Sequence, residues 1–71
     1  MNYLELTRRL RVLGCEETPR RGGGSHRRWL NPTTGLSSPV PDWGHKDLKA
    51  GTVRAIVRQL GLTREEFGEI K

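Results

Sequence analysis

Hydrophobic residues recur every three or four positions near the start of the chain, and this spacing predicts an amphipathic helix. The apolar stripe consists of Tyr3, Leu6, Leu10 and Leu13. Asn2 is a residue type that caps helix N-termini, and Glu5 favours the positive end of the helix dipole. Gly14 supplies a natural stop. The sequence therefore predicts a first helix with one buried side.

The same spacing returns near the other end of the chain. Its apolar positions are Val53, Ile56, Val57 and Leu60. We expect this second helix to begin near Gly51 or Thr52 and to end at Gly61. The run Thr63-Arg64-Glu65-Glu66 has the form of a capping box, in which a threonine and a glutamate satisfy backbone donors at a helix start. It predicts a final helical turn with Phe67 packed inward.

Between the two helices, proline and glycine interrupt the chain too often for a third long helix. Three short strands fit this region best: Cys15–Arg20, Ser25–Asn31 and Leu36–Val40. The stretches Arg21–Gly24 and Asn31–Gly35 have the composition of hairpin loops. Because Pro19 and Pro39 cannot donate to a β-ladder, their strands are expected to be short or to lie at a sheet edge.

The predicted order is helix, three antiparallel strands, helix, in one α+β domain that spans residues 1–71. Two helices on one face of a small sheet bury both apolar stripes and leave the other face open. Along the middle strand, His26 and Arg28 share the open face, while Arg27 and Trp29 point inward. We interpret Trp29 as the core anchor, with a base-stacking platform as the alternative. Arg27 must then extend its head toward the sheet edge.

The net charge of the chain indicates which class of partner it binds. The formal net charge is +5, and ten of the thirteen basic residues are arginine, so the domain attracts polyanions. An ordinary basic domain is the alternative. No apolar run is long enough for a membrane span or a signal peptide, which predicts a cytoplasmic protein without a membrane partner. The single cysteine, Cys15, excludes an internal disulfide and a cysteine zinc site; we expect it to pack, not to react.

The candidate chemistry lies in the ten residues 20–29. Three consecutive glycines precede His26, and arginines flank it on both sides. A histidine that takes the proton of a ribose 2′-hydroxyl lets that oxygen attack the adjacent phosphate, while arginine stabilises the developing charge. His26 is the predicted catalytic residue and Arg28 the phosphate clamp. The alternative is that the glycines form only a flexible loop and His26 is an ordinary exposed strand residue.

Further residues are expected to bind the RNA substrate. The full predicted set is Gly24, Ser25, Arg27, Arg28, Lys46, Lys49 and Arg54. The start of the second helix adds backbone amide donors for a phosphate, although a merely solvated basic face is equally compatible. The two histidines are nineteen positions apart, and the sequence has no acidic cluster. It therefore contains no metal-ligand pattern, and neither a metal nor a cofactor is expected. His45 lies in a polar loop. There its side chain is either simply solvated or assists the reaction as an acid.

Several segments resemble the HicA family, the toxin halves of type II toxin–antitoxin pairs. They are Gly24-Ser25-His26, Asn31-Pro32, Val40-Pro41, Lys46-Asp47-Leu48-Lys49 and the second helix from Gly51 to Leu62. The resemblance extends from the first helix through Glu65-Glu66-Phe67. It implies a double-stranded-RNA-binding-domain-like fold and a ribonuclease that cleaves messenger RNA, with His26 as the catalytic histidine and Gly24 as its preceding glycine.

The resemblance also implies a HicB antitoxin that covers the active site, so the toxin is expected as a monomer alone and in a hetero-oligomer with its antitoxin. The sequence departs from the family twice. Many relatives carry a histidine roughly where Trp43 stands, and others carry apolar residues where Arg27 and Arg28 stand. Two other functions use the same basic surface: a non-catalytic RNA-binding module, and a structural subunit that meets an acidic protein.

Overall fold

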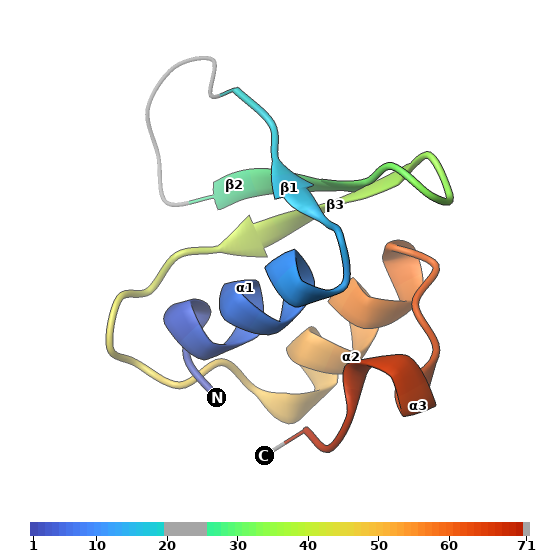
Figure 1. The fold of residues 1–71 in the computed structure, drawn as a ribbon. Helices are drawn as coiled ribbons and strands as arrows, with labels where there is room; N and C mark the ends of the chain where they lie inside the picture. Colours follow the sequence, from blue (N-terminus) through green and yellow to red (C-terminus); the bar gives the residue numbers. More distant parts are fainter. Residues whose placement is uncertain (20–25, 71) are drawn as a thin grey trace.

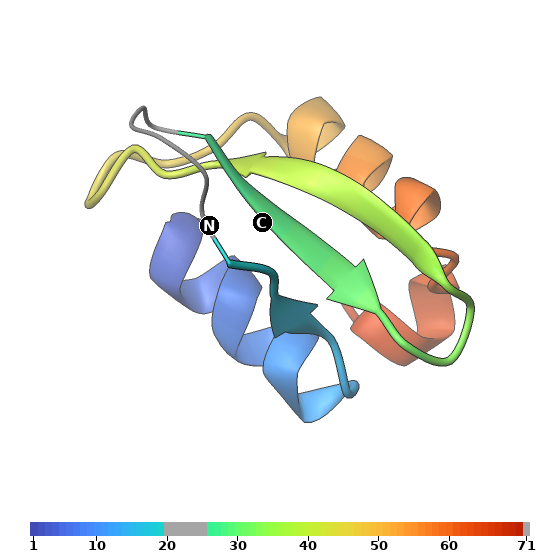
Figure 2. The ribbon, with the colours of Figure 1, turned by 90° about the horizontal axis from the view of Figure 1, so that it is seen from above.

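The computed structural model describes residues 1–19 and 26–70. Its elements are α1 (Tyr3–Val12), β1 (Glu16–Glu17), β2 (His26–Asn31), β3 (Leu36–Pro41), α2 (Ala50–Gln59) and α3 (Arg64–Phe67). In these residues the strands form one antiparallel sheet in the order β1-β2-β3, and the helices lie on one side of it (Figures 1 and 2). The predicted α+β fold, with α-β-β-β-α order and an open sheet face, is confirmed.

Some predicted boundaries shift. The first strand is only two residues long, against a predicted Cys15–Arg20, although the Thr18 amide still donates to the Arg28 carbonyl at 2.9 Å. Pro19 follows and has no amide to continue the ladder. The second helix begins at Ala50, before Gly51, because the Val53 amide already bonds the Lys49 carbonyl at 3.0 Å. The predicted loop at 21–24, with positions 20 and 25, lies outside the described residues.

The core lies between the sheet and the helices. Trp29 on β2 is fully buried, and its neighbours in the core include Leu6 and Leu10 from α1 and Ile56 from α2. The inward assignment of Trp29 is therefore confirmed. Burying so large an aromatic side chain contributes a sizeable hydrophobic term, and its indole N–H stays satisfied by donating to the Tyr3 hydroxyl at 3.2 Å.

A buried amide attaches the β2–β3 hairpin to the end of α2. Asn31, at the end of β2, donates from Nδ2 to the Leu60 carbonyl at 2.8 Å and accepts from the Thr33 amide at 3.1 Å. One strand over, the Ser38 hydroxyl is 2.8 Å from Oε1 of Gln59 on α2. These contacts fix the orientation of the sheet on the helices, and with it the direction of the open face.

Cys15 precedes β1 and is buried. Burial raises the pKa of its thiol, because a thiolate loses hydration in an apolar surrounding. The predicted packing role agrees with this burial. In the part of the chain that the structure describes, α1 and α2 have ten residues each, and no helix is long and apolar enough to cross a membrane.

Candidate functional site

His26 is the first residue of β2, and its side chain is exposed. In the antiparallel register it lies opposite Pro41, the last residue of β3. His26 is therefore at the end of the sheet where the chain leaves β3 for the connection to α2, and both views show this connection projecting from that end (Figures 1 and 2). The alternation along β2 puts its imidazole on the face that no helix covers.

Arg28 shares the open face with His26 and is also exposed. Its Nη1 donates to the Ser37 hydroxyl at 3.1 Å, and Ser37 lies opposite Leu30 in the register. The guanidinium thus leans along the sheet toward the hairpin and away from His26. Two strand residues span about 6.8 Å, so the exposed imidazole and the guanidinium can contact different groups of one extended ligand.

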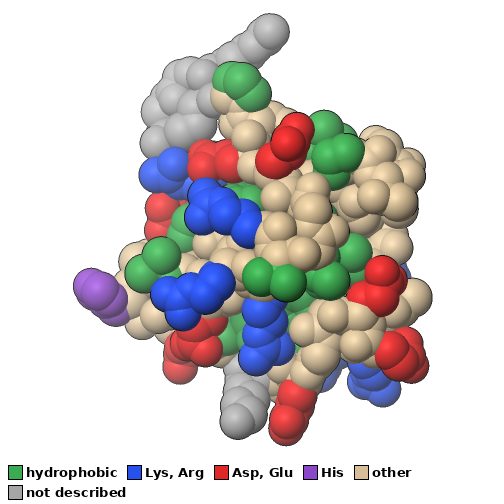
Figure 3. Space-filling view, in the orientation of Figure 1, with side chains coloured by type: hydrophobic (Ala, Val, Ile, Leu, Met, Phe, Trp, Pro, Cys, Tyr) green, Lys and Arg blue, Asp and Glu red, His purple; other side chains and the backbone are tan. Residues whose placement is uncertain are grey.

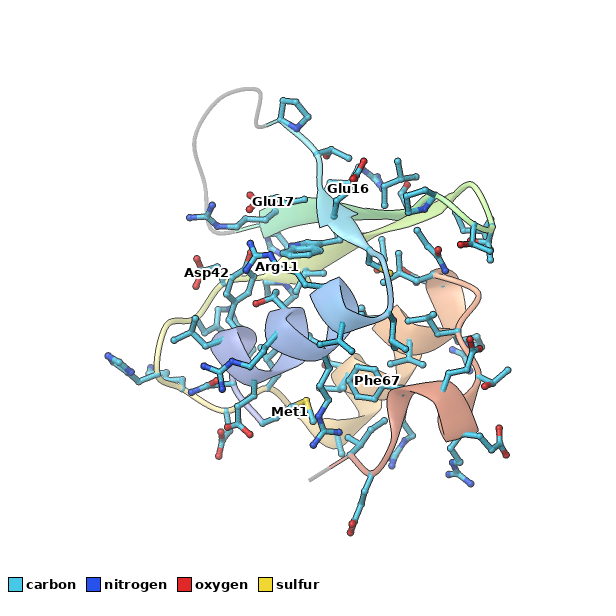
Figure 4. The ribbon with its side chains drawn as sticks, in the orientation of Figure 1. Met1, Arg11, Glu16, Glu17, Asp42 and Phe67 are labelled. Atoms are coloured by element: carbon cyan, nitrogen blue, oxygen red, sulfur yellow. The ribbon has the colours of Figure 1, made fainter. Side chains whose placement is uncertain are left out.

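Arg27 points to the opposite face and is engaged there by two carboxylates. Its Nη1 lies 3.0 Å from Glu17 Oε2, and its Nε lies 3.0 Å from Asp42 Oδ2. The hydrogen bond to Glu17 has the larger effect and the one to Asp42 the next, and both raise the pKa of the Arg27 guanidinium. Its charge is thereby neutralised within the fold, so we assign Arg27 a structural role and leave it out of the substrate-binding set. Figure 4 shows Glu17 and Asp42 reaching this region from β1 and from the end of β3.

The aromatic side chains beneath this ion-pair cluster complete it. The Arg27 guanidinium lies 5.8 Å from the ring centroid of Tyr3, and Arg11 lies 5.0 Å from that of Trp29. Burial raises the pKa of the Tyr3 hydroxyl, which accepts the indole hydrogen bond of Trp29. Contacts from α1, from β1 and from the residue after β3 therefore fix the position of the start of β2, where His26 lies.

The connection after β3 begins with a closed turn. Asp42 Oδ1 accepts from the Gly44 amide at 3.1 Å, and the Lys46 amide donates to the Trp43 carbonyl at 3.2 Å. At its far end, Asp47 forms a β-bridge with Asn2. The turn exposes Trp43, His45 and Lys46, and a hollow is lined by Asp42, Trp43 and Lys46. Lys46 therefore lies at the same end of the sheet as His26.

The remaining predicted substrate-binding residues do not all join this face. Lys49 is exposed at the N-cap position of α2, where its side chain makes no capping hydrogen bond, whereas Arg54 lines a groove with Arg64 and Ile70. Arg64 belongs to α3, and Figure 1 shows α3 on the side of the helices away from the sheet. Arg54 is thus separated from the open face. Gly24 and Ser25 lie outside the described residues.

Basic side chains are not concentrated on the face seen in Figure 3. There, Lys and Arg alternate with Asp and Glu around α1 and β1, so the view shows no continuous basic patch. Within residues 1–19 and 26–70, no group of three or more histidine, cysteine, aspartate or glutamate side chains is placed to hold a metal ion. The sheet face that carries His26 and Arg28 remains the candidate site.

Comparison with known proteins identifies the family. The family model described as "HicA toxin of bacterial toxin-antitoxin" matches residues 4–62. The chain belongs to this family. The match runs from α1 to just beyond α2, and therefore includes His26, Arg28 and the connection with Trp43, but not α3. No curated protein and no solved structure matches the chain. As a HicA-family member, the protein is a toxin of a toxin–antitoxin pair.

Sequence reasoning missed three features of the candidate site in this HicA-family chain. It did not predict the two ion pairs of Arg27 or the hydrogen bond from Arg28 to Ser37, and it gave Trp43 no role. The inward direction of Arg27 was itself a signal, because a partly buried guanidinium requires acidic partners, and Glu17 and Asp42 supply them. The hydrogen bond from Arg28 to Ser37 depends on strand register, and the exposure of Trp43 depends on loop geometry. Local sequence patterns encode neither.

Proposed function

We propose that this HicA-family toxin is a metal-independent endoribonuclease that cleaves messenger RNA with His26 as its general base or acid. The observation that carries the proposal is the exposure of His26 on the uncovered sheet face, with Arg28 two residues further along the same face. A titratable group on the same accessible sheet face as a guanidinium fork suits phosphate-ester chemistry.

The reaction needs only groups that RNA and the protein supply. The His26 imidazole takes the proton of a ribose 2′-hydroxyl, and the 2′ oxygen attacks the neighbouring phosphorus. The bond to the 5′ oxygen of the next nucleotide then breaks, leaving a 2′,3′-cyclic phosphate and a 5′-hydroxyl that regains a proton. Arg28 steadies the adjacent phosphate, and Lys46, at the same end of the sheet as His26, adds positive charge. DNA lacks the 2′-hydroxyl, so the site binds it without cutting it.

The proposed partner is a HicB-type antitoxin that covers the open face and prevents RNA from reaching His26. The toxin acts as a monomer in the cytoplasm and forms a hetero-oligomer with the antitoxin. This assignment is supported by the toxin–antitoxin family and by the uncovered sheet face, which offers a surface for a partner.

The test compares His26→Ala with the parent protein on single-stranded RNA in the presence of a chelator. Acid–base catalysis by one side chain contributes about 10²- to 10⁴-fold, so the variant is expected to cleave at least about a hundredfold more slowly. His45→Ala separates the two alternatives for that exposed histidine: the parental rate is expected of a solvated side chain, and slower cleavage would assign His45 the role of the acid. Equal cleavage by His26→Ala and the parent would overturn the role of His26.

Two further readouts separate cleavage from binding. Replacing the 2′-hydroxyl at the cleaved position by hydrogen should abolish cleavage and preserve binding. Expression in cells should arrest growth, and co-expression of the antitoxin should relieve the arrest. Binding without any cleavage by the parent would favour the alternative function, a non-catalytic RNA-binding module on the same face.

A further inference from the structure

The two tryptophans of this chain differ sharply in exposure. Trp29 is 0% exposed in the core, whereas Trp43 is 45% exposed. Among the large hydrophobic side chains that are exposed in the described part of the chain, Trp43 is the aromatic one; the others are Leu4, Val12 and Leu36. An indole held half in water has a flat apolar face available for a ligand.

Trp43 is presented by a fixed turn. The residue before it, Asp42, bonds the Arg27 guanidinium through one oxygen and the Gly44 amide through the other. The Trp43 carbonyl accepts from the Lys46 amide, which closes the turn on the other side. The backbone that carries the indole is therefore ordered before any ligand binds, so little conformational entropy remains to be lost.

The turn lies beside the proposed catalytic residue. Pro41 is the register partner of His26, and Trp43 follows Pro41 by two residues. Trp43, Asp42 and Lys46 line a shallow hollow of about 500 Å³. The hollow thus combines a planar apolar surface with a cation, at the end of the sheet where His26 begins β2.

We propose that Trp43 is a stacking platform for an unpaired RNA base near the cleaved phosphate, and that Lys46 binds the phosphate of the same nucleotide. A nucleotide supplies both a flat ring and an anion, and this pairing matches the hollow better than a purely apolar side chain does. Aromatic stacking tolerates every base but favours the larger faces of purines, so adenine should bind more tightly than uracil. The inference rests on the proposed RNA-binding role of this face.

The test uses the full chain with His26→Ala, so that the RNA stays intact during titration. Short single-stranded oligoadenylate and oligouridylate that carry a fluorescent label are titrated by anisotropy, which gives an affinity for every variant, and tryptophan fluorescence is followed in the proteins that keep Trp43. Because Trp29 is buried, quenching by bound RNA reports on Trp43. Trp43→Leu keeps an apolar side chain without a ring for stacking, Trp43→Phe keeps a smaller ring, and Val12→Ala removes an exposed apolar side chain on α1 as the control.

Trp43→Leu is expected to weaken oligoadenylate binding about 5- to 150-fold, the range that loss of one stacked base gives. Trp43→Phe should weaken it by a smaller factor and remove the fluorescence response, and Val12→Ala should bind like the parent. Parental affinity in Trp43→Leu, or RNA binding without quenching, would overturn the proposal. So would a Trp43→Leu variant that loses only antitoxin binding, because the indole would then be a protein contact.

The nuclease proposal and the Trp43 stacking proposal can be refuted independently of each other. Oligonucleotides that quench Trp43 while the parent protein cuts no RNA would refute the nuclease and support the stacking site. Cleavage by the parent that proceeds with the same KM after Trp43→Leu would support the nuclease and refute the stacking site.

Discussion

Arg27 Nε and Asp42 Oδ2 lie 3.0 Å apart, and this ion pair joins the second residue of β2 to the first residue after β3. His26 is the sequence neighbour of one partner, and Trp43 is the neighbour of the other. The same guanidinium also binds Glu17 on β1. One partly buried arginine therefore fixes the relative positions of the proposed catalytic histidine and the proposed base platform.

Replacing Arg27 by glutamine should destabilise the protein and impair it as an enzyme. The change leaves the Glu17 and Asp42 carboxylates close together without their cation, so we expect the melting temperature to fall by roughly 5–10 °C. Thermal unfolding followed by circular dichroism measures this. Arg28→Gln, which removes an exposed arginine from the same strand, should shift the melting temperature by roughly 3 °C or less. Equal shifts for both variants would contradict the structural role of Arg27.

Arg28→Ala should weaken RNA binding and its dependence on salt. Each phosphate contact to single-stranded nucleic acid contributes about −0.7 to the slope of log affinity against log salt concentration, so the slope should become shallower by about 0.7. Loss of a charge-assisted contact should also lower affinity by roughly tenfold at low salt.

The matched control for Arg28→Ala is Arg54→Ala. It removes the same charge from the groove beside α3, away from the open face. Fluorescence anisotropy of a labelled oligonucleotide at several salt concentrations measures both variants. A slope that changes equally in the two would show that only total charge matters.

The sequence predicted the direction of the side chains along β2 because strand alternation is a local property. His26 and Arg28 point outward and Trp29 inward, as the period of two requires. The partners of Arg27 were not predictable in the same way. Glu17 is ten residues away and Asp42 fifteen, and they converge only through strand register. Local patterns therefore predicted the directions of these side chains, while the contacts that hold Arg27 required the tertiary structure.

The basic residues around the second helix illustrate the opposite outcome. Lys46, Lys49 and Arg54 lie close together in the sequence, so a common phosphate site was a reasonable prediction. Arg54 lies one turn into α2, however, on a side that faces the region of α3. The short helix α3 was predicted from its capping box, and the predicted inward packing of Phe67 is confirmed, but the side of α2 against which α3 lies was not predicted. Nearness in sequence was therefore a poor guide to a shared surface here.

Gly61→Ala should be more destabilising than Gly35→Ala. Both glycines have positive φ, +71° and +75°, so an alanine Cβ strains either backbone by about 1–2 kcal/mol. A Cβ at Gly61 would also meet Thr34 Cγ2 at 2.8 Å, whereas one at Gly35 would meet nothing within 4 Å. The Thr34 hydroxyl is held by the Leu60 carbonyl, so its methyl group cannot move away freely.

Urea denaturation of the two glycine variants measures the difference in unfolding free energy. Adding Thr34→Ser to Gly61→Ala removes the methyl group and keeps the hydroxyl, so this second change should recover part of the lost stability. The clash would be disproved if the serine variant recovered nothing, or if the two glycine substitutions were equally costly.

Cys15 should react slowly with thiol reagents in the folded protein. Burial both shields the sulfur and raises the pKa of its thiol, so at neutral pH the nucleophilic thiolate is scarcer than in a free cysteine. Ellman's reagent should label the native protein much more slowly than the protein in urea, and the native rate should still be rising above pH 9. Equal rates in the two states at pH 7 would be inconsistent with the buried site.

Glu66 should stabilise the capping box of α3 in a pH-dependent way. Its carboxylate accepts from the Thr63 amide at 2.9 Å, and this backbone hydrogen bond, followed by the one to the Thr63 side chain, lowers the pKa of Glu66. A lowered folded-state pKa means that the added stability is present above the unfolded value, 4.5, and is lost as the pH falls through the folded value.

Glu66→Ala should therefore lower the melting temperature by a few degrees at pH 7 and by less at pH 3, because the contribution of the carboxylate charge declines as the pH falls toward and through the folded-state pKa of Glu66. Glu65→Ala, an exposed neighbour on the same turn, is the control and should show a weaker dependence on pH. Melting curves of both variants and the parent at the two pH values decide the matter. A penalty for Glu66→Ala that is equal at pH 7 and pH 3 would mean that the negative charge contributes nothing to the cap.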